Sequence, residues 1–206
     1  MDKLIDDLIK LAFAEDIGDG DHTTLCCIPE TAMGKSQLII KEDGVLAGVE
    51  MAKRIFHDFD PELKMTVFIQ DGAEVKKGDI AFVVEGKIQS LLQTERLMLN
   101  VMQRMSGIAT TTRKYAKALE GTKTHVLDTR KTTPGMRMIE KEAVRIGGGM
   151  NHRIGLFDMI LLKDNHVDFA GGIEQAITRA QNYLKEKGKS LKIEIEFVTS
   201  TSWNKP

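Results

Sequence analysis

One stretch of the sequence places charged residues where an apolar segment ends. HVLDTRKTTPG, residues 125–135, begins like a buried strand and then carries Asp128, Arg130 and Lys131. In sheets of parallel strands, ligands bind beyond the carboxyl ends of the strands. A carboxylate and two cations at this position are therefore expected to face a bound substrate.

Two later stretches repeat this arrangement. FDMILLKDN, residues 157–165, carries Lys163 near its end, and LKIEIEF, residues 191–197, carries Glu194 and Glu196. A strand period of two puts both glutamates on one face, where the cations of the other stretches are natural partners. Opposite charges at one end of a sheet are typical of an active site. The alternatives are a buried structural ion-pair network and, for Glu194, a sheet edge facing solvent.

A run of three glycines lies between the first two charged stretches. RIGGGMNHRIG contains Gly147, Gly148 and Gly149, followed by His152 and Arg153. Glycines allow the backbone to approach a ligand closely, although such a run also marks an ordinary helix end. With the basic residues that follow, the segment is a candidate for substrate binding.

Further cations precede the glycine run at helical spacing. Arg137, Lys141 and Arg145 fit either a solvated helix face or a site for a small polyanion, because arginine binds carboxylate or phosphate through paired hydrogen bonds. The sequence has no phosphate-binding GxxxxGK[ST], no GxGxxG after a strand and no clear set of zinc ligands.

The hydrophobic periodicity predicts an α/β protein. Helices are predicted over residues 3–15, 49–59, 94–119, 137–147 and 172–188. Strands are predicted within residues 36–48 around an Asp-Gly turn, within 64–92, and over 125–130, 157–165 and 191–197. The first half therefore resembles a small α+β unit, whereas alternating strands and helices after residue 125 predict a parallel sheet covered by helices. The polar segment 15–24 is predicted to be a structural loop.

The composition limits the classes of function. The chain has 206 residues, 42% of them hydrophobic, which is enough for a core in one large or two small domains. Its net charge of −1 predicts neither nucleic acid nor an anionic membrane as a partner. No apolar run approaches the roughly 18 residues of a membrane span. The adjacent Cys26 and Cys27 and the absence of a signal-peptide core predict reduced thiols in a cytoplasmic protein.

Several of these motifs together resemble one enzyme family. DTRKTTPG, GGGMNHR and LLKDNH, supported by EDIGDGDHTT and TERLMLNVMQRMSGIAT, closely resemble the quinolinate phosphoribosyltransferases, also called carboxylating nicotinate-nucleotide pyrophosphorylases. The resemblance implies that quinolinate and phosphoribosyl pyrophosphate, with Mg²⁺, give nicotinate mononucleotide, pyrophosphate and CO₂ in NAD biosynthesis. It also implies an N-terminal α+β sandwich with a linking helix, residues 1–112, followed by an incomplete parallel α/β barrel, residues 113–206.

The resemblance further implies roles for individual residues. Those expected to bind substrate are Arg96, Arg130, Lys131, His152, Arg153 and Lys163. In the family two subunits form a dimer, and Arg96 matches an arginine donated to the partner's site. Catalytic roles are expected for Lys131, Lys163 and Glu196, with Glu196 near the ribose and the metal.

The sequence also departs from the family pattern. After Phe197 it reads VTSTSWNKP, whereas the resemblance implies further barrel strands with glycine-rich loops for the ribose 5-phosphate. The expectation is a C-terminally truncated enzyme with an exposed sheet edge at 191–197, unable by itself to make nicotinate mononucleotide at a useful rate. The alternatives are a non-catalytic fragment or remnant, a biotinyl- or lipoyl-type carrier suggested by DGAEVKKGDIAFVVEG, and the family's molybdenum-transport-associated homologue.

Overall fold

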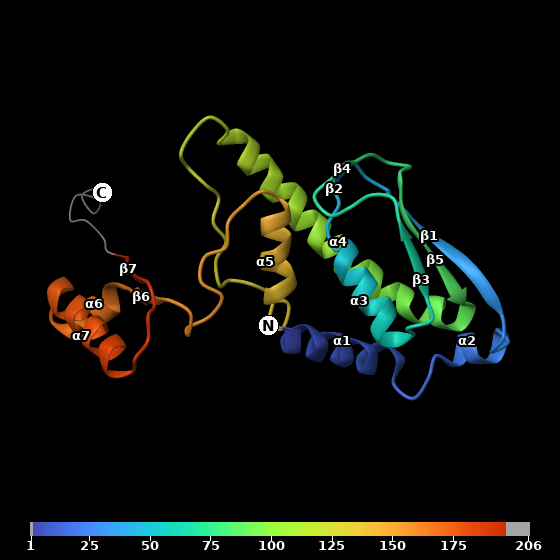
Figure 1. Cartoon of the computed structure of the whole chain (residues 1–206), viewed down its shortest axis with the longest axis horizontal. Helices are drawn as coiled ribbons and strands as arrows, with labels where there is room; N and C mark the ends of the chain where they lie inside the picture. The colour runs from blue at the N-terminus through green and yellow to red at the C-terminus, as the bar shows by residue number, and fades with distance from the viewer. Residues whose placement is uncertain (1, 197–206) are drawn as a thin grey trace, which may run out of the picture. The chain divides into compact units, whose positions relative to one another are not determined.

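The structure, a computed structural model, describes residues 2–196 (Figure 1). Two compact units are present, one ending at His152 and the other beginning at Arg153. The predicted α/β class is confirmed, because both units combine helices with strands. The predicted domain division at residue 112 stays a prediction.

An antiparallel sheet forms the frame of the first unit. Its strands β1 (Met33–Ile39), β5 (Ile80–Lys87) and β3 (Lys64–Val67) lie in the order β1-β5-β3, and a separate pair joins β2 (Gly44–Val45) to β4 (Glu74–Val75). The strands on the two sides of the Asp43-Gly44 turn therefore have different partners instead of forming a hairpin. The side chain of Asp43 accepts the backbone N–H of Lys77 (2.8 Å), so this turn bonds the segment before β5.

Helix α4 (Ile88–Ala118) is the longest element of the first unit and follows β5 directly. It begins six residues before the predicted start, and Ser106 and Gly107 do not interrupt it. With α3 (Val49–Phe59) it encloses the core, whose largest fully buried side chains include Phe82, Ile55 and Met105. Met98, Met102 and Met105 of α4 are all buried in this core.

Polar residues of α4 bond the backbone of the neighbouring segment. The hydroxyl of Thr110 accepts the N–H of Val45 (2.9 Å), and Ser106 bonds both the N–H and the carbonyl of Ala47 (3.0 and 3.1 Å). For these backbone groups of Val45 and Ala47, hydroxyls of α4 take the place of a strand partner.

The N-terminal helix is longer than predicted, and the loop after it is shorter. Helix α1 (Asp2–Ile17) is followed by the short α2 (His22–Cys27), which begins inside the predicted loop 15–24. Asp21 caps α2 by accepting the N–H of Thr24 (3.1 Å), and this bonding lowers the pKa of Asp21. The segment therefore has the structural role expected of it.

The predicted barrel strands are shorter than their apolar runs. Residues 125–130 form only a parallel bridge between Leu127 and Met150, after which comes α5 (Arg137–Ile146). In the second unit, β6 (Ile160–Leu162) pairs in parallel with β7 (Ile193–Ile195), as predicted. The chain between them forms α6 (Asp164–Ala170), which the sequence does not predict, and α7 (Ile173–Glu186). Phe197, VTSTSWNKP and the end of the predicted sheet edge lie outside the described residues.

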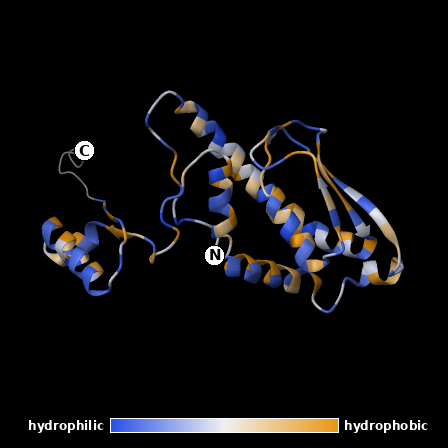
Figure 2. Ribbon diagram, viewed as in Figure 1, coloured by the Kyte–Doolittle hydropathy of each residue, from blue (hydrophilic) through white to orange (hydrophobic). Residues whose placement is uncertain are grey.

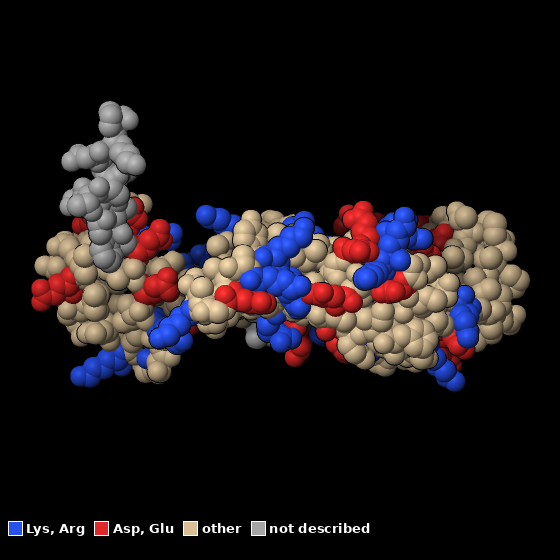
Figure 3. Space-filling view, turned by 90° about the horizontal axis from the view of Figure 1, so that it is seen from above, with Lys and Arg blue, Asp and Glu red and all other residues tan. Residues whose placement is uncertain are grey.

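The surface and the helices are of mixed polarity. Within residues 2–196, no helix combines the length and the apolar character that crossing a membrane requires. Helices α1 and α7 carry both hydrophilic and hydrophobic residues (Figure 2). On the face drawn in Figure 3, basic and acidic side chains are interspersed, which fits the small net charge.

The glycine run packs against α4. A side chain at Gly147 would meet the carbonyl oxygen of Ala109 at 2.6 Å and Thr112 Cβ at 2.7 Å, and one at Gly149 would meet Val144 and Thr112 within 3.0 Å. Gly147 also ends α5. Two of the three glycines are thus explained by helix packing, which favours the structural reading of this run over close approach to a ligand.

We predict that Gly147→Ala destabilises the chain by about 1 to 3 kcal/mol, the cost of overpacking against backbone that cannot move aside. Gly107→Ala is the matched control, because nothing lies within 4 Å of its added Cβ on α4. That change should stabilise by about 0.5 to 1 kcal/mol. Urea unfolding of both variants measures the difference, and equal midpoints would contradict the packing role of Gly147.

Candidate functional site

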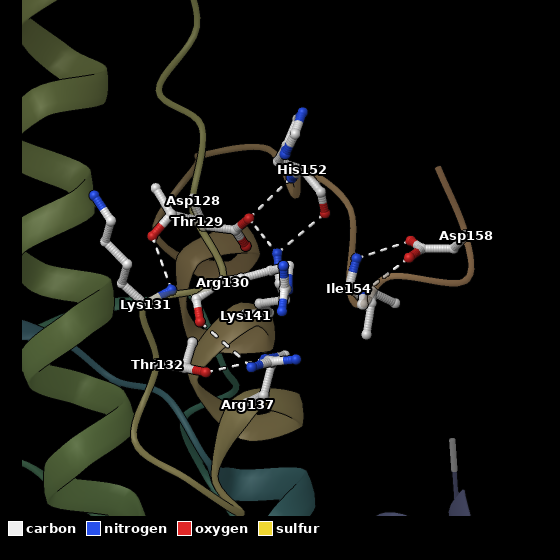
Figure 4. A network of polar contacts seen from close by, with 11 residues as sticks. Asp128, Thr129, Arg130, Lys131, Thr132, Arg137, Lys141, His152, Ile154 and Asp158 are labelled. Carbon is white, nitrogen blue, oxygen red and sulfur yellow. Dashed lines mark hydrogen bonds and ion pairs between the residues drawn. The ribbon is translucent and has the colours of Figure 1, made fainter. Parts of the chain in front are cut away.

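A buried ion pair joins the first charged stretch to the segment after the glycine run. Lys141 Nζ contacts Asp128 Oδ1, with only 3% and 6% of the two side chains exposed, and it also donates to the carbonyl of His152 (3.0 Å). The same Asp128 oxygen accepts the N–H of His152 (2.9 Å), as Figure 4 shows. With its amide nitrogen turned toward them, Asn151 bonds Asp128 Oδ2 (2.8 Å) and the carbonyl of Lys141 (2.9 Å).

These contacts correct two expectations. Asp128 does not face a substrate, because protein donors occupy its carboxylate. Lys141 belongs neither to a solvated face nor to an open polyanion site, since it is buried and bonded. The structural reading of a buried ion-pair network therefore holds for this pair.

Arg130 and Lys131 follow Asp128 on a loop and point in different directions (Figure 4). Arg130 is half-buried, and its Nε is buried without a hydrogen-bond partner in the part of the chain that the structure describes. Lys131 is exposed, and its backbone N–H donates to Thr129 Oγ1 (3.1 Å). A buried guanidinium nitrogen lacking an acceptor is a place where an anionic ligand would restore the missing hydrogen bond.

A second charged network holds the end of this loop. Arg104 of α4 bonds Glu140 Oε1 through Nη2 (2.6 Å) and Nε (3.0 Å), and its Nη2 also donates to Thr133 Oγ1 (2.8 Å). Burial alone would raise the pKa of Glu140, but hydrogen bonds from Thr133 and Arg104 outweigh it, so the pKa lies below its ordinary value. Glu140 is therefore ionised at neutral pH.

In the second unit, Lys163 and Glu196 form the predicted ion pair. Lys163 Nζ lies 3.0 Å from Glu196 Oε2, and 47% and 60% of the two side chains are exposed. The parallel pairing of β6 with β7 brings them together, because Lys163 directly follows β6 and the N–H of Glu196 donates to Leu162 (2.7 Å). Glu194 lies opposite Leu161 of β6 and is exposed, which agrees with the alternative that it faces solvent.

The other predicted site residues differ in exposure. Arg153 is 8% exposed, and its Nη1 donates to the carbonyl of Met159 (3.4 Å). One of its guanidinium nitrogens is therefore hydrogen-bonded within the second unit. His152 is half-buried, and its backbone is held by Asp128 and Lys141. Arg96 is exposed on α4.

The residues predicted for the site therefore fall in both units. The first places Arg130, Lys131 and His152 around the Asp128–Lys141 pair, and the second contains Arg153, Lys163 and Glu196. Sequence reasoning missed the roles of Arg104 and Glu140. No local spacing reveals their pairing, because Arg104 lies 29 residues from Thr133 and 36 residues from Glu140 along the chain.

Carboxylates are too scattered to form a metal site of protein ligands alone. Within residues 2–196, no three His, Cys, Asp or Glu side chains gather to hold a metal ion. Glu196 is an exposed carboxylate that pairs with a lysine. This arrangement fits a cation such as Mg²⁺ only when substrate oxygens supply most of the ligands, which is a common mode for that ion.

Family models match both halves of the chain. The N-terminal domain of quinolinate phosphoribosyl transferase matches residues 21–106, and the C-terminal domain matches residues 108–203. The chain belongs to the quinolinate phosphoribosyltransferase family. This membership favours the family reading over a carrier module, and the segment DGAEVKKGDIAFVVEG falls inside the N-terminal domain match.

Individual relatives agree with the family match. Quinolinate phosphoribosyltransferase [decarboxylating] 1 of Nicotiana glauca is 46% identical over 190 residues, which are 92% of this chain and 54% of the relative. The chloroplastic nicotinate-nucleotide pyrophosphorylase [carboxylating] of Arabidopsis thaliana shows the same identity and the same coverage. The chain thus spans about half the length of these curated relatives.

Solved structures support the fold. The crystal structure of NadC from Streptococcus pyogenes is 39% identical and superposes with a TM-score of 0.89, over 97% of this chain and 70% of that one. The nicotinate-nucleotide pyrophosphorylase from Francisella tularensis is 37% identical, with a TM-score of 0.86, over 99% and 71% of the two chains. The family fold therefore applies to both units.

We predict that Lys141→Met costs about 3 to 5 kcal/mol of stability, because it leaves the buried Asp128 carboxylate without its cation. Adding Asp128→Asn should recover much of that loss, since Asn still accepts the His152 N–H. The control is Lys117→Met, which breaks the exposed Lys117–Glu74 pair and should cost under about 1 kcal/mol. Similar urea midpoints for Lys141→Met and the control would show that the buried pair is not required.

Proposed function

We propose that this chain contributes the quinolinate-binding part of a phosphoribosyltransferase. The reaction transfers the phosphoribosyl group of phosphoribosyl pyrophosphate to quinolinate and releases pyrophosphate and CO₂, giving nicotinate mononucleotide for NAD biosynthesis. The observation that carries the proposal is the buried Nε of Arg130, which has no acceptor among the described residues of a chain belonging to this family. An anionic ligand supplies such an acceptor.

The charge of quinolinate suits the basic residues around this loop. Quinolinate has two ring carboxylates, so its site requires several cations in a pocket with little water. Arg130 offers a planar donor group from a half-buried position, while Lys131 and His152 lie on the segments that the Asp128–Lys141 pair holds together. In this proposal Arg153 and Lys163 are further cations for the substrate, as the resemblance to the family implies.

The reaction then needs stabilisation at three points. The quinolinate nitrogen forms a bond to the ribosyl carbon as the bond to pyrophosphate breaks, and Lys131 and Lys163 offset the negative charge that develops. Glu196 favours the cationic character of the ribosyl carbon and would hold Mg²⁺, which neutralises charge on the leaving pyrophosphate. When CO₂ leaves, the electron pair of the broken C–C bond stays on the ring carbon, where the adjacent positively charged nitrogen stabilises it until that carbon takes up a proton from water.

Catalytic turnover by this chain is part of the same proposal. The second candidate is a non-catalytic fragment or remnant of that enzyme, and the match covers 54% of the curated relatives' length. A coupled assay of pyrophosphate release by the purified chain separates the two, since turnover on the order of 1 per second is ordinary for an enzyme.

We also propose that the protein is cytoplasmic, because Cys26 and Cys27 are free and exposed, as thiols in a reducing compartment are.

We predict that Arg130→Ala weakens quinolinate binding by about 2 to 4 kcal/mol, because it removes one member of a desolvated charge pair. The control is Arg145→Ala on α5, whose side chain is 64% exposed and bonds Glu142 of the same helix. Calorimetric titration with quinolinate measures both affinities. Unchanged affinity in Arg130→Ala, beside tight binding by the parent chain, would refute the role of Arg130.

The homodimer gives a separate prediction. Arg96 is exposed on α4, and in this proposal it completes the partner subunit's site. Arg96→Ala and Lys163→Ala chains should each bind quinolinate weakly, whereas a mixture that exchanges subunits should regain some intact sites. Sedimentation tests whether the chains form dimers, and calorimetry measures the number of quinolinate-binding sites. A monomer, or a mixed dimer without recovered sites, would argue against the shared site.

A further inference from the structure

Within residues 2–196 no strand pairs with the loop that carries Arg130 and Lys131, and side chains of α5 bond this loop instead. Arg137 Nη2 of α5 donates to the carbonyl of Arg130 (3.3 Å), and Arg137 Nε donates to Thr132 Oγ1 (3.0 Å). The N–H of Thr133 donates to Glu140 Oε2 (3.2 Å). The first turns of α5 thus do for this loop what a paired strand does in a sheet.

Thr133 is the point where two helices meet the loop. Glu140 of α5 accepts its backbone N–H, and Arg104 of α4 donates to its hydroxyl (2.8 Å). Arg104 and Glu140 also bond each other, and the Glu140 side chain is 8% exposed. Thr133 itself is exposed and buries little apolar surface. Its contacts therefore fix a position more than they add to the core.

The packing of α4 against α5 does not depend on Thr133. Buried Met105 on α4 and buried Ile139 and Ala143 on α5 belong to one hydrophobic core. An ion pair that served the helices alone would need no partner on the loop. That both Arg104 and Glu140 extend to the same loop residue indicates a second purpose.

We propose that Arg104 and Glu140 are positioning residues that fix Thr133 and thereby the directions of the Arg130 and Lys131 side chains. The proposal rests on the function proposed above in one respect, namely that Arg130 and Lys131 bind the anionic substrate. Neighbouring side chains of an extended segment point to opposite sides, so a slip of the loop would move Arg130 away from its half-buried position. A fixed Thr133 prevents that slip three residues further along.

The test compares Glu140→Met with Glu142→Met. Both changes remove a glutamate from α5 that pairs with an arginine, but Glu142 pairs with the exposed Arg145 and has no bond to the loop. Methionine keeps much of the glutamate volume and a good helix propensity. We expect Glu140→Met to speed hydrogen exchange at the Thr133 amide and to weaken quinolinate binding, each by about tenfold, the change that 1.4 kcal/mol represents. Glu142→Met should change neither.

A second pair of variants keeps the test decisive if Glu140→Met fails to fold. Thr133→Val removes only the hydroxyl that Arg104 bonds and alters an exposed residue, whereas Thr133→Ser keeps that hydroxyl. The valine variant should lose quinolinate affinity without a change in urea midpoint. The serine variant should keep the quinolinate affinity of the parent chain. A purely structural role would move the urea midpoint and leave the affinity of the folded protein unchanged.

The two readouts separate this proposal from the proposed function. Unchanged exchange at Thr133 in Glu140→Met would overturn the positioning role, whether or not quinolinate binds. Faster exchange with unchanged quinolinate affinity would show that the loop position does not matter to the ligand, which also overturns it. If the parent chain binds no quinolinate but exchange at Thr133 still becomes faster, the proposed function fails and the positioning of the loop is supported.

Discussion

The buried pair of Asp128 and Lys141 is the interaction on which the arrangement of the first unit's site depends. It ties α5 to the segment before the loop and to the backbone of His152, which lies 24 residues further along the chain. The parallel bridge between Leu127 and Met150 supplies only a few backbone hydrogen bonds there. Because an isolated charge is costly in such a place, neither residue is tolerated without the other. The pair therefore specifies one arrangement of the two segments.

Several residues of the charged motifs thus hold segments of the candidate site in place. In LDTRKTTPG, the aspartate is structural, the arginine and lysine remain available, and the second of the three threonines beyond Asp128 bonds Arg137. Gly147 and Gly149 let α5 and the chain after it approach α4 closely. A motif that identifies a family therefore includes residues whose contacts in this chain are structural.

The sequence was a good guide to element types and a poorer guide to partners. Helical periodicity located α1, α3, α5 and α7, and the alternation of strand and helix indicated the parallel pair β6–β7 that brings Lys163 to Glu196. It did not predict that 125–130 would form only a bridge. A short apolar run does not reveal whether a full-length strand partner lies beside it. The pairing of Arg104 with Glu140 was equally hidden, because it depends on how α4 and α5 pack.

Helix α4 gives these local contacts a common mechanical reference. It is continuous from Ile88 to Ala118, and it carries both Arg96 and Arg104, which are eight residues or about 12 Å apart along its axis. A helix is stiff over such a distance, so sliding or rotation of this rod moves both arginines together. Any contact that Arg96 makes outside its own chain is thereby linked to the position along the helix axis at which Arg104 bonds Thr133. The loop geometry and the surroundings of Arg96 consequently cannot be adjusted independently, by evolution or by design.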